Sequence, residues 1–173
     1  MSTDKFTVCL WFNNEAEDAA KFYTSIFKDG KIGKTRYYGK EGFEFHQQPE
    51  GSVMTVDFYA NGLHFQALNG GPLFKFNEAI SLVITCDSQK DIDYYWEKLT
   101  GQGGNEVQCG WLKDKFGLSW QVVPKQFEEM MDSANKAGAG RALNAMFTMK
   151  KFDIEKLEGA FNDHESTIKA GDQ

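Results

Sequence analysis

A short pattern that ends in glutamine occurs twice in this sequence, as GLHFQ at residues 62–66 and as GLSWQ at residues 117–121. Each copy begins with Gly, has Leu second and an aromatic residue fourth, and runs into apolar residues. A glutamine amide donates and accepts hydrogen bonds and carries no charge. We therefore expect Gln66 and Gln121 to occupy equivalent positions facing a shared cavity, which would suit a neutral or weakly polar molecule.

Three histidines are the candidates for acid–base chemistry, because imidazole titrates near neutral pH. His64 lies two residues before Gln66, so it faces the same side of its strand. It is a candidate acid/base, although a hydrogen-bonded or rim histidine is the favoured interpretation. His46 belongs to a polar loop placed to cover the cavity, where a surface role and a ligand contact are equally compatible with the sequence. His164 lies in the polar tail and is expected to play no part.

Aromatic residues near the second glutamine are candidates for stacking on a flat ligand. They are Trp111 and Phe116, and the alternative is that they belong to the core or to a dimer interface. Cys109 precedes them, and nothing near it in the sequence indicates a reactive thiol. Trp120 directly precedes Gln121, so it is expected to point to the other side of the strand and pack against a helix.

The elements that must position these residues follow the order strand, helix, strand, strand, strand. Strands of the first copy are expected at 6–12, 31–39, 52–60 and 62–69. A helical stripe covers 16–27, and Asn14 with Glu17 predicts a capping box at its start. The Asn61-Gly62 pair predicts a hairpin turn, and residues 40–51 are interpreted as a loop.

The same order restarts after a linker at residues 70–78. Strands of the second copy are expected at 80–86, 105–109, 110–115 and 118–123. Ser88 is the expected cap of the helix between them. After Pro124 the apolar spacing becomes helical, with Asp153 as the cap of a last short helix. The string Gly138-Ala139-Gly140 lies between two helical patterns and is interpreted as a helix stop.

Composition narrows the class of protein. The formal net charge of −6 over 173 residues argues against a nucleic-acid partner, which requires a basic face. Apolar residues make up 41% of the chain, which indicates a folded globular protein, yet no apolar run reaches the ~20 residues that cross a bilayer. Three cysteines in a chain without a signal-like start predict reduced thiols and a cytoplasmic location.

Long segments of the chain carry a family resemblance. They are CLWFNNEAEDAAKFYTSIF, ISLVITCDSQKDIDYYWEKL, CGWLKDKFGLSWQVVP and GRALNAMFTMKKFDIEKLEGAF. Together they resemble the PhnB-like proteins, also labelled 3-demethylubiquinone-9 3-methyltransferase-like, of the vicinal oxygen chelate superfamily. This superfamily includes glyoxalase I, extradiol dioxygenases and the fosfomycin and bleomycin resistance proteins.

The resemblance implies an α+β fold in which two βαβββ modules form a curved, cup-like mixed sheet around a ligand cavity, with a C-terminal helical extension. A single glyoxalase-like domain would span residues 1–173, with module one at 5–69, module two at 79–124 and the helical extension at 125–162. A homodimer is also expected from the resemblance, because the relatives commonly assemble their modules in pairs.

In the metal-using relatives, His, Glu or Gln side chains project inward from the first and last strands of each module. The matching places in this chain are Thr7, Gln66, Ile80 or Ser81, and Gln121. Catalytic divalent ions are usually held by His and carboxylate side chains. Thr, Ile and Ser supply neither, and a Gln amide is a modest ligand. We therefore infer that the metal site has been lost, and we expect no metal and no cofactor.

The main hypothesis is a metal-free, small-molecule-binding protein of the glyoxalase/bleomycin-resistance fold. Its expected ligand contacts are Gln66, Gln121, Thr7, Ser81, Trp111, His46 and Phe116. A metal-dependent or acid/base lyase, isomerase or dioxygenase on the same scaffold stays open, with His64 as the acid/base. A methyltransferase acting on a quinone-like acceptor is disfavoured, because a doubly wound S-adenosylmethionine fold would show a glycine-rich turn between a strand and a helix.

Overall fold

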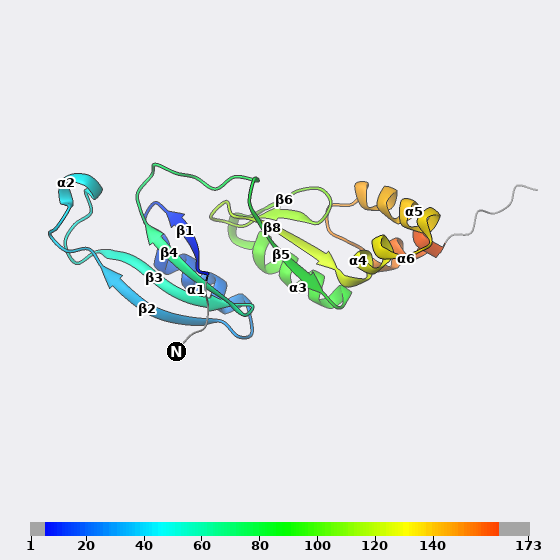
Figure 1. Ribbon diagram of the computed structural model, residues 1–173, viewed down its shortest axis with the longest axis horizontal. Coiled ribbons are helices and arrows are strands. Elements are labelled where there is room, and N and C mark those ends of the chain that lie inside the picture. Colours follow the sequence, from blue (N-terminus) through cyan, green and yellow to red (C-terminus); the bar gives the residue numbers. More distant parts are fainter. Residues whose placement is uncertain (1–5, 163–173) are drawn as a thin grey trace, which may run out of the picture. The chain divides into compact units, whose positions relative to one another are not determined.

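The computed structural model describes residues 6–162 and divides the chain into two compact units, Met1–Phe76 and Asn77–Gln173. Each unit contains a four-stranded mixed sheet and a helix that packs on it (Figure 1). The sheet and its helix follow the order strand, helix, strand, strand, strand in both units. A short helical segment precedes a strand in each, α2 (Phe43–His46) in the first unit and η1 (Gly101–Gly103) in the second, and three helices follow the second sheet. The predicted α+β class and the repeated βαβββ order are therefore confirmed.

The first unit has the strand order β1-β4-β3-β2, with β1 parallel to β4 and the other pairs antiparallel. Its strands are β1 (Val8–Phe12), β2 (Lys31–Tyr37), β3 (Val53–Ala60) and β4 (Leu63–Asn69). The predicted hairpin turn joins β3 to β4, and both Asn61 and Gly62 have positive φ, as a tight turn of this kind requires. The Asp29 carboxylate accepts the backbone N–H of both turn residues at 2.8 and 2.6 Å.

Helix α1 (Ala16–Ile26) forms the core of the first unit. Its buried alanines let it approach the sheet closely, and Tyr23 stacks on Phe58 with ring centroids 5.6 Å apart. The predicted capping box is wrong, because no side chain next to the helix start caps it. The Oδ1 atom of Asn69, at the end of β4, accepts the backbone N–H of Ala16 at 2.9 Å instead. The helix start is thus tied to the sheet by a contact that local sequence does not reveal.

Substituting Asn69 by alanine is expected to destabilise the protein by about 2–3 kcal/mol, because it leaves one buried and one partly buried backbone group without this partner. Asn69 is 6% exposed, and its Nδ2 atom also donates to the Val53 carbonyl at 3.0 Å. Urea denaturation followed by tryptophan fluorescence measures the change. Asn77→Ala removes an exposed bond to the Ala79 N–H and serves as the control, with an effect below about 0.5 kcal/mol. An equal effect of the two substitutions would contradict the assigned role of Asn69.

The loop predicted at residues 40–51 contains one helical turn, α2 (Phe43–His46), which the sequence did not indicate. His46 ties this turn together: its Nδ1 atom accepts the Gln48 N–H at 2.9 Å, and its ring lies on that of Tyr38 with centroids 4.5 Å apart. The aromatic residues of the segment thus have a local structural use.

The second unit repeats the arrangement with the strand order β5-β8-β7-β6. Its elements are β5 (Ser81–Cys86), α3 (Gln89–Thr100), the short helix η1 (Gly101–Gly103), β6 (Asn105–Glu106), β7 (Trp111–Lys113) and β8 (Ser119–Pro124). The predicted Ser88 cap is confirmed, since its side chain accepts the Asp91 N–H. Strands β6 and β7 are shorter than predicted. Trp120 is 4% exposed, as expected for a residue on the helix side of β8.

Three helices follow the second sheet: α4 (Lys125–Asp132), α5 (Lys136–Phe147) and α6 (Ile154–Asn162). The predicted cap at Asp153 is confirmed, because its Oδ1 atom accepts the Lys156 N–H at 3.1 Å. The guanidinium of Arg141 on α5 donates to the Ala160 and Phe161 carbonyls at 2.9 and 2.8 Å. This cation satisfies the free carbonyls at the end of α6 and fixes the two helices together.

The helix stop predicted at residues 138–140 is wrong, because these residues lie in the first turns of α5. Asn135 caps the helix by accepting the Gly138 N–H at 3.0 Å. A Cβ atom on Gly138 would lie 2.7 Å from the Phe161 carbonyl oxygen, so a glycine is needed where α5 and α6 approach each other.

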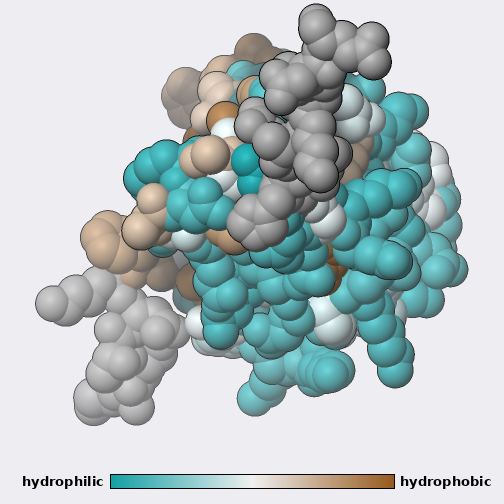
Figure 2. Space-filling view, turned by 90° about the vertical axis from the view of Figure 1, so that its right-hand side faces the viewer, coloured by the Kyte–Doolittle hydropathy of each residue, from teal (hydrophilic) through white to brown (hydrophobic). Residues whose placement is uncertain are grey.

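Within residues 6–162, none of the helices combines the length and the apolar character that crossing a bilayer requires. Hydrophilic residues make up most of the face shown in Figure 2, and hydrophobic residues gather toward its upper left.

Candidate functional site

Each sheet has a face covered by its helix and an open face on which a ligand could lie. Along β4 the buried residues are Phe65, Ala67 and Asn69, and the half-buried residues between them are His64, Gln66 and Leu68. His64 and Gln66 therefore share the open face, as predicted from their spacing.

The side chain of Gln66 belongs to a polar row that crosses three strands. Its Nε2 atom donates to Oδ1 of Asp57 on β3 at 3.1 Å, and the guanidinium of Arg36 on β2 donates to Oδ2 of the same carboxylate at 2.8 Å. Burial alone would raise the pKa of Asp57, but the hydrogen bonds from Gln66 and Arg36 and the guanidinium charge outweigh it and lower the pKa below its usual value. The carboxylate on this face is thus already neutralised by a cation of the protein.

The variant Arg36→Met is expected to cost about 1–2 kcal/mol of stability at neutral pH, because it leaves the Asp57 carboxylate without its cation and Arg36 is 38% exposed. A lowered pKa in the folded state stabilises the protein above the unfolded pKa, and this stabilisation is lost as pH falls through the folded value. The difference between wild type and variant should therefore shrink below about pH 4.

The measurement is the free energy of unfolding of both proteins at neutral and acidic pH. Lys40→Met breaks a surface ion pair, in which the Lys40 and Glu50 charges are 3.9 Å apart, and is the matched control with almost no expected effect. A pH-independent cost of Arg36→Met would contradict the assigned role of the pair.

His64 lies beside this row and is contacted at the edge of its ring and on one ring face. Its Nδ1 atom is 2.9 Å from the Thr7 hydroxyl, and its ring stacks on that of Tyr59 with centroids 4.7 Å apart. Its Nε2 atom is buried and has no hydrogen-bond partner among the described residues. This arrangement favours the hydrogen-bonded histidine over the acid/base, because one ring nitrogen is occupied and the other is hidden from solvent.

On the second sheet, Gln121 lies in the middle of the open face. Its Nε2 atom donates to the Ser81 hydroxyl on β5 at 2.8 Å, and its neighbours across the sheet are Val83 on β5 and Trp111 on β7. Ser81 is the opening-strand residue that contacts Gln121, whereas Ile80 precedes the strand and is 71% exposed.

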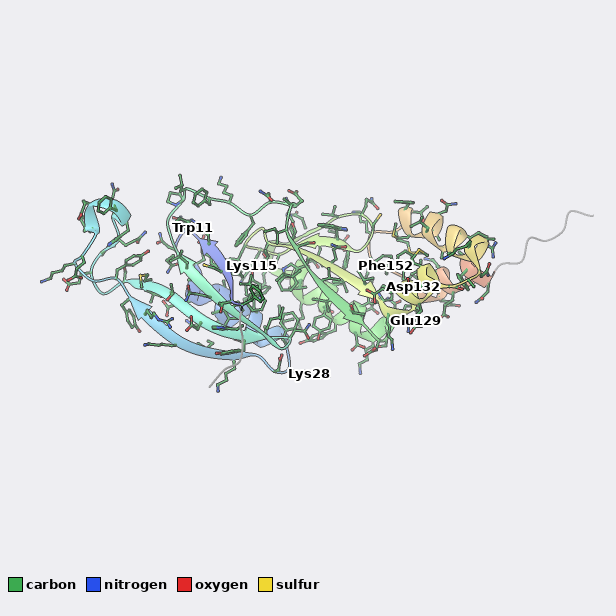
Figure 3. The ribbon with its side chains drawn as sticks, in the orientation of Figure 1. Trp11, Lys28, Lys115, Glu129, Asp132 and Phe152 are labelled. Carbon is green, nitrogen blue, oxygen red and sulfur yellow. The ribbon has the colours of Figure 1, made fainter. Side chains whose placement is uncertain are left out.

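A groove of about 620 Å³ lies on this open face and is bounded by the helices that follow the sheet. Its floor comes from Val83, Trp111, Gln121 and Val123. Its walls include Phe127 and Met131 of α4, Met146 and Phe147 of α5, and Phe152. Concave, mainly apolar sites of this size with a few placed polar groups are typical of small-molecule binding. Phe152 and the wall residue Asp132 are labelled in Figure 3.

The remaining predicted site residues lie elsewhere. His46 belongs to the α2 turn of the first unit, and Phe116 lies in the turn between β7 and β8 and is not among the residues that line the groove. His164 is outside the described residues. The second unit therefore brings together the predicted residues Trp111, Gln121 and Ser81. In the first unit, His64 and Gln66 lie on β4, and Thr7, which directly precedes β1, contacts His64.

The residues on the two open faces do not fit a catalytic metal. Among residues 6–162, no group of three or more His, Cys, Asp or Glu side chains is arranged to hold an ion. Asp57 is paired with Arg36, and Gln121 with Ser81 offers only neutral oxygen and nitrogen atoms. A divalent cation would meet a guanidinium on one face and no anionic ligand on the floor of the other, so we derive no chemistry through a metal.

Two parts of the site were missed in the sequence. The strand expected at 52–60 contains Asp57, and a charged residue inside the apolar run VMTVDFYA is a recognisable signal of a buried ion pair. The groove walls were predicted only as helical stripes. Phe147 lies on such a stripe yet is 61% exposed, which marks a helix face that the core does not cover.

Comparison with known proteins identifies relatives of the sheet-forming part of the chain. A family model described as 3-demethylubiquinone-9 3-methyltransferase matches residues 4–123. The structure of a PhnB protein from Bacillus cereus is 33% identical, and the match covers 70% of this chain and 99% of that chain with a TM-score of 0.61. No curated protein matches the sequence significantly.

More distant structures share the fold. A protein from Pseudomonas aeruginosa is 17% identical, with coverage of 70% of this chain and 98% of that one and a TM-score of 0.56. The fosfomycin resistance protein FosX from Mesorhizobium loti is 12% identical, with coverage of 77% and 100% and a TM-score of 0.52. At these identities the likeness concerns the fold alone.

Proposed function

Because this chain belongs to the 3-demethylubiquinone-9 3-methyltransferase family, as a PhnB-like member of the vicinal oxygen chelate superfamily, we propose that it binds a small organic molecule without a catalytic metal. The binding site that we propose is the groove on the open face of the second sheet. The observation that carries the proposal is that Gln121 and Trp111 form the floor of a largely apolar groove, and that the polar group on this floor is an uncharged amide.

The chemistry of the groove supports binding more than catalysis. Gln121 is held by Ser81 and has no strong acid, base or nucleophile beside it on the sheet, and a carboxamide does not ionise near neutral pH, so it is a poor general acid or base. A lyase, isomerase or dioxygenase would need either metal ligands or an accessible acid/base, and the candidate His64 has its Nε2 atom buried. Enzymatic activity therefore has weaker support than binding.

The methyltransferase activity in the family description has no structural support in this chain. The turns from β1 to α1 and from β5 to α3 are formed by Asn13-Asn14-Glu15 and Asp87-Ser88, which contain no glycine. A doubly wound S-adenosylmethionine fold relies on glycines at this turn for close approach of the cofactor to the backbone. Calorimetric titration with S-adenosylmethionine is therefore expected to show no heat of binding, and saturable binding would restore this function.

We also propose a cytoplasmic homodimer. The free thiols of Cys9, Cys86 and Cys109 support a reducing environment, and sedimentation velocity measures the oligomeric state.

The test of the proposed function is a thermal-shift screen of chelator-treated protein against small organic molecules. Compounds that raise Tm for the wild type should fail to do so for Val83→Trp, because Val83 lies on the groove floor and is 51% exposed, so the larger ring fills the groove without disturbing the core. Leu63→Trp places the same ring at a strand position of the first unit that is also 51% exposed and is outside the lining residues, and it should keep the shift.

Two results would overturn the proposal. One is the absence of any stabilising compound across several chemical classes. The other is an equal shift in Val83→Trp and wild type, which would place the binding site elsewhere.

A further inference from the structure

We propose that the groove of the second unit selects flat apolar organic cations, such as arylalkyl amines. This inference rests on the proposed function and adds the class of ligand. It follows from two acidic side chains on the rim, the absence of a basic residue in the lining, and the aromatic floor.

The negative charge comes from helix α4. Glu128 and Asp132 are one helical turn apart on α4, and both line the groove together with Phe127 and Met131. No ion pair involves either carboxylate within residues 6–162, and none of the residues that line the groove is Lys or Arg. The nearest base in sequence, Lys125, pairs with Glu129 at 3.7 Å. The charge of the two rim carboxylates is thus available to a guest.

The C-terminal end of α4 adds to the negative charge at the rim of the groove. Asp132 is the last residue of the helix, where the unpaired backbone carbonyls place partial negative charge. Carboxylates are normally favoured at the opposite end of a helix, so the position of Asp132 costs local stability and is unexplained by helix formation. A cation bound at the rim would relieve both the carboxylate charge and the helix end.

The floor of the groove determines which uncharged part of the ligand fits. Trp111 is half-buried and offers a flat aromatic surface, and Val83 and Val123 lie on the same face of the sheet. The Ser81 hydroxyl can accept or donate, so the Gln121 amide can turn either its oxygen or its nitrogen to the guest. A ligand with an apolar ring over Trp111 and an ammonium group toward α4 matches both the aromatic floor and the acidic rim.

The walls that carry the charge lie outside the family match. The family model ends at residue 123, whereas Glu128 and Asp132 follow it. The proposed preference for cations is therefore a property of the helices of this chain and not of the family core.

The first test uses three probes that share one ring system and differ in charge: naphthylmethylamine, naphthalenemethanol and naphthoate. Isothermal titration of chelator-treated protein should give an affinity for the amine roughly 10-fold above that for the carboxylate at low salt, with the alcohol between them. Added salt should reduce the ratio, because both rim carboxylates are exposed.

The double variant Glu128→Gln/Asp132→Asn should bring the three affinities together. Its control, Glu44→Gln/Glu97→Gln, removes the same charge from exposed helix positions outside the lining and should keep the ratio. Equal binding of all three probes to wild type would overturn the preference for cations and leave the proposed function standing. Binding of none of them would overturn the inference and count against the proposed function.

A second test needs no ligand, because Cys109 lines the groove. Cys9 is exposed and is removed by Cys9→Ser, whereas burial raises the pKa of Cys86 to about 12 and keeps it unreactive. In the Cys9→Ser background, the rate constant for modification of Cys109 is measured with trimethylammonioethyl methanethiosulfonate and with the sulfonatoethyl reagent. The ratio of the cationic to the anionic rate constant should be several-fold higher for Cys109 than for a small, uncharged thiol compound in solution. The double variant should remove the difference. A faster reaction with the anionic reagent, or resistance to both reagents, would overturn the inference.

Discussion

Replacing Asp114 by alanine is expected to destabilise the second unit by about 3–5 kcal/mol, the largest stability effect that we predict. Asp114 is 2% exposed. Its Oδ1 atom accepts the backbone N–H groups of Phe116 and Leu118 at 2.9 and 3.1 Å, and its Oδ2 atom accepts Nε1 of Trp120 at 2.8 Å. The variant leaves these donors without their partner inside the turn that begins β8.

Urea denaturation followed by tryptophan fluorescence measures this loss. Trp120→Phe is the matched comparison, because it keeps a buried ring and removes one hydrogen bond, with an expected cost of about 1–2 kcal/mol. The loss of unfolding free energy in Asp114→Asn should lie between those of Asp114→Ala and Trp120→Phe. The new amide nitrogen faces the Trp120 N–H, and two donors cannot form a hydrogen bond. A cost of Asp114→Ala no larger than that of Trp120→Phe would show that the carboxylate does not organise the turn.

Truncating Trp111 to alanine is expected to weaken the binding of naphthylmethylamine by roughly 10-fold or more, the largest effect on binding that we predict. Trp111 lies across the sheet from Gln121 and forms the aromatic part of the groove floor. Removing its ring takes away the stacking surface and leaves the polar contacts in place. Trp111→Phe keeps a smaller ring and should retain most of the affinity.

Isothermal titration of the amine into each variant measures this effect, and near-ultraviolet circular dichroism checks that the variant is folded. Tyr37→Ala removes an aromatic residue that is 59% exposed on the first unit and should leave the affinity unchanged. A folded Trp111→Ala variant with wild-type affinity would exclude stacking on this residue.

Local patterns predicted the order of elements well, because each signal acts within a few residues. The Asn61-Gly62 turn, the Ser88 cap and the Asp153 cap all lie where the sequence placed them. The two-residue period of a strand also predicted that His64 and Gln66 share one face.

Contacts between distant segments were not predictable in the same way. The start of α1 is capped by Asn69, which lies more than fifty residues further along the chain, and the local capping box that the sequence suggested is absent. Gly138 and Gly140 lie inside α5, and Gly138 is required there because a Cβ atom would collide with α6, which is a tertiary requirement. A glycine alone cannot reveal whether it ends a helix or lets two helices approach.

In the candidate site, too, local patterns indicated residues, whereas contacts between distant segments were not predictable. The sequence predicted Gln66, Gln121 and Ser81 as site residues through the repeat and the family resemblance, and Trp111 as an aromatic residue near Gln121. It did not indicate that Arg36 neutralises Asp57, or that α4 and α5 bound the groove, because both depend on how strands and helices assemble.

The central claim is that neutral side chains have replaced the metal ligands. The most direct test is the metal content of the protein purified without chelators, together with calorimetric titration of the chelator-treated protein with Zn²⁺ and Ni²⁺. We predict only traces of metal, no saturable heat, and no change on Gln66→Leu or Gln121→Leu. One tightly bound divalent ion per chain that is lost in either variant would contradict the account.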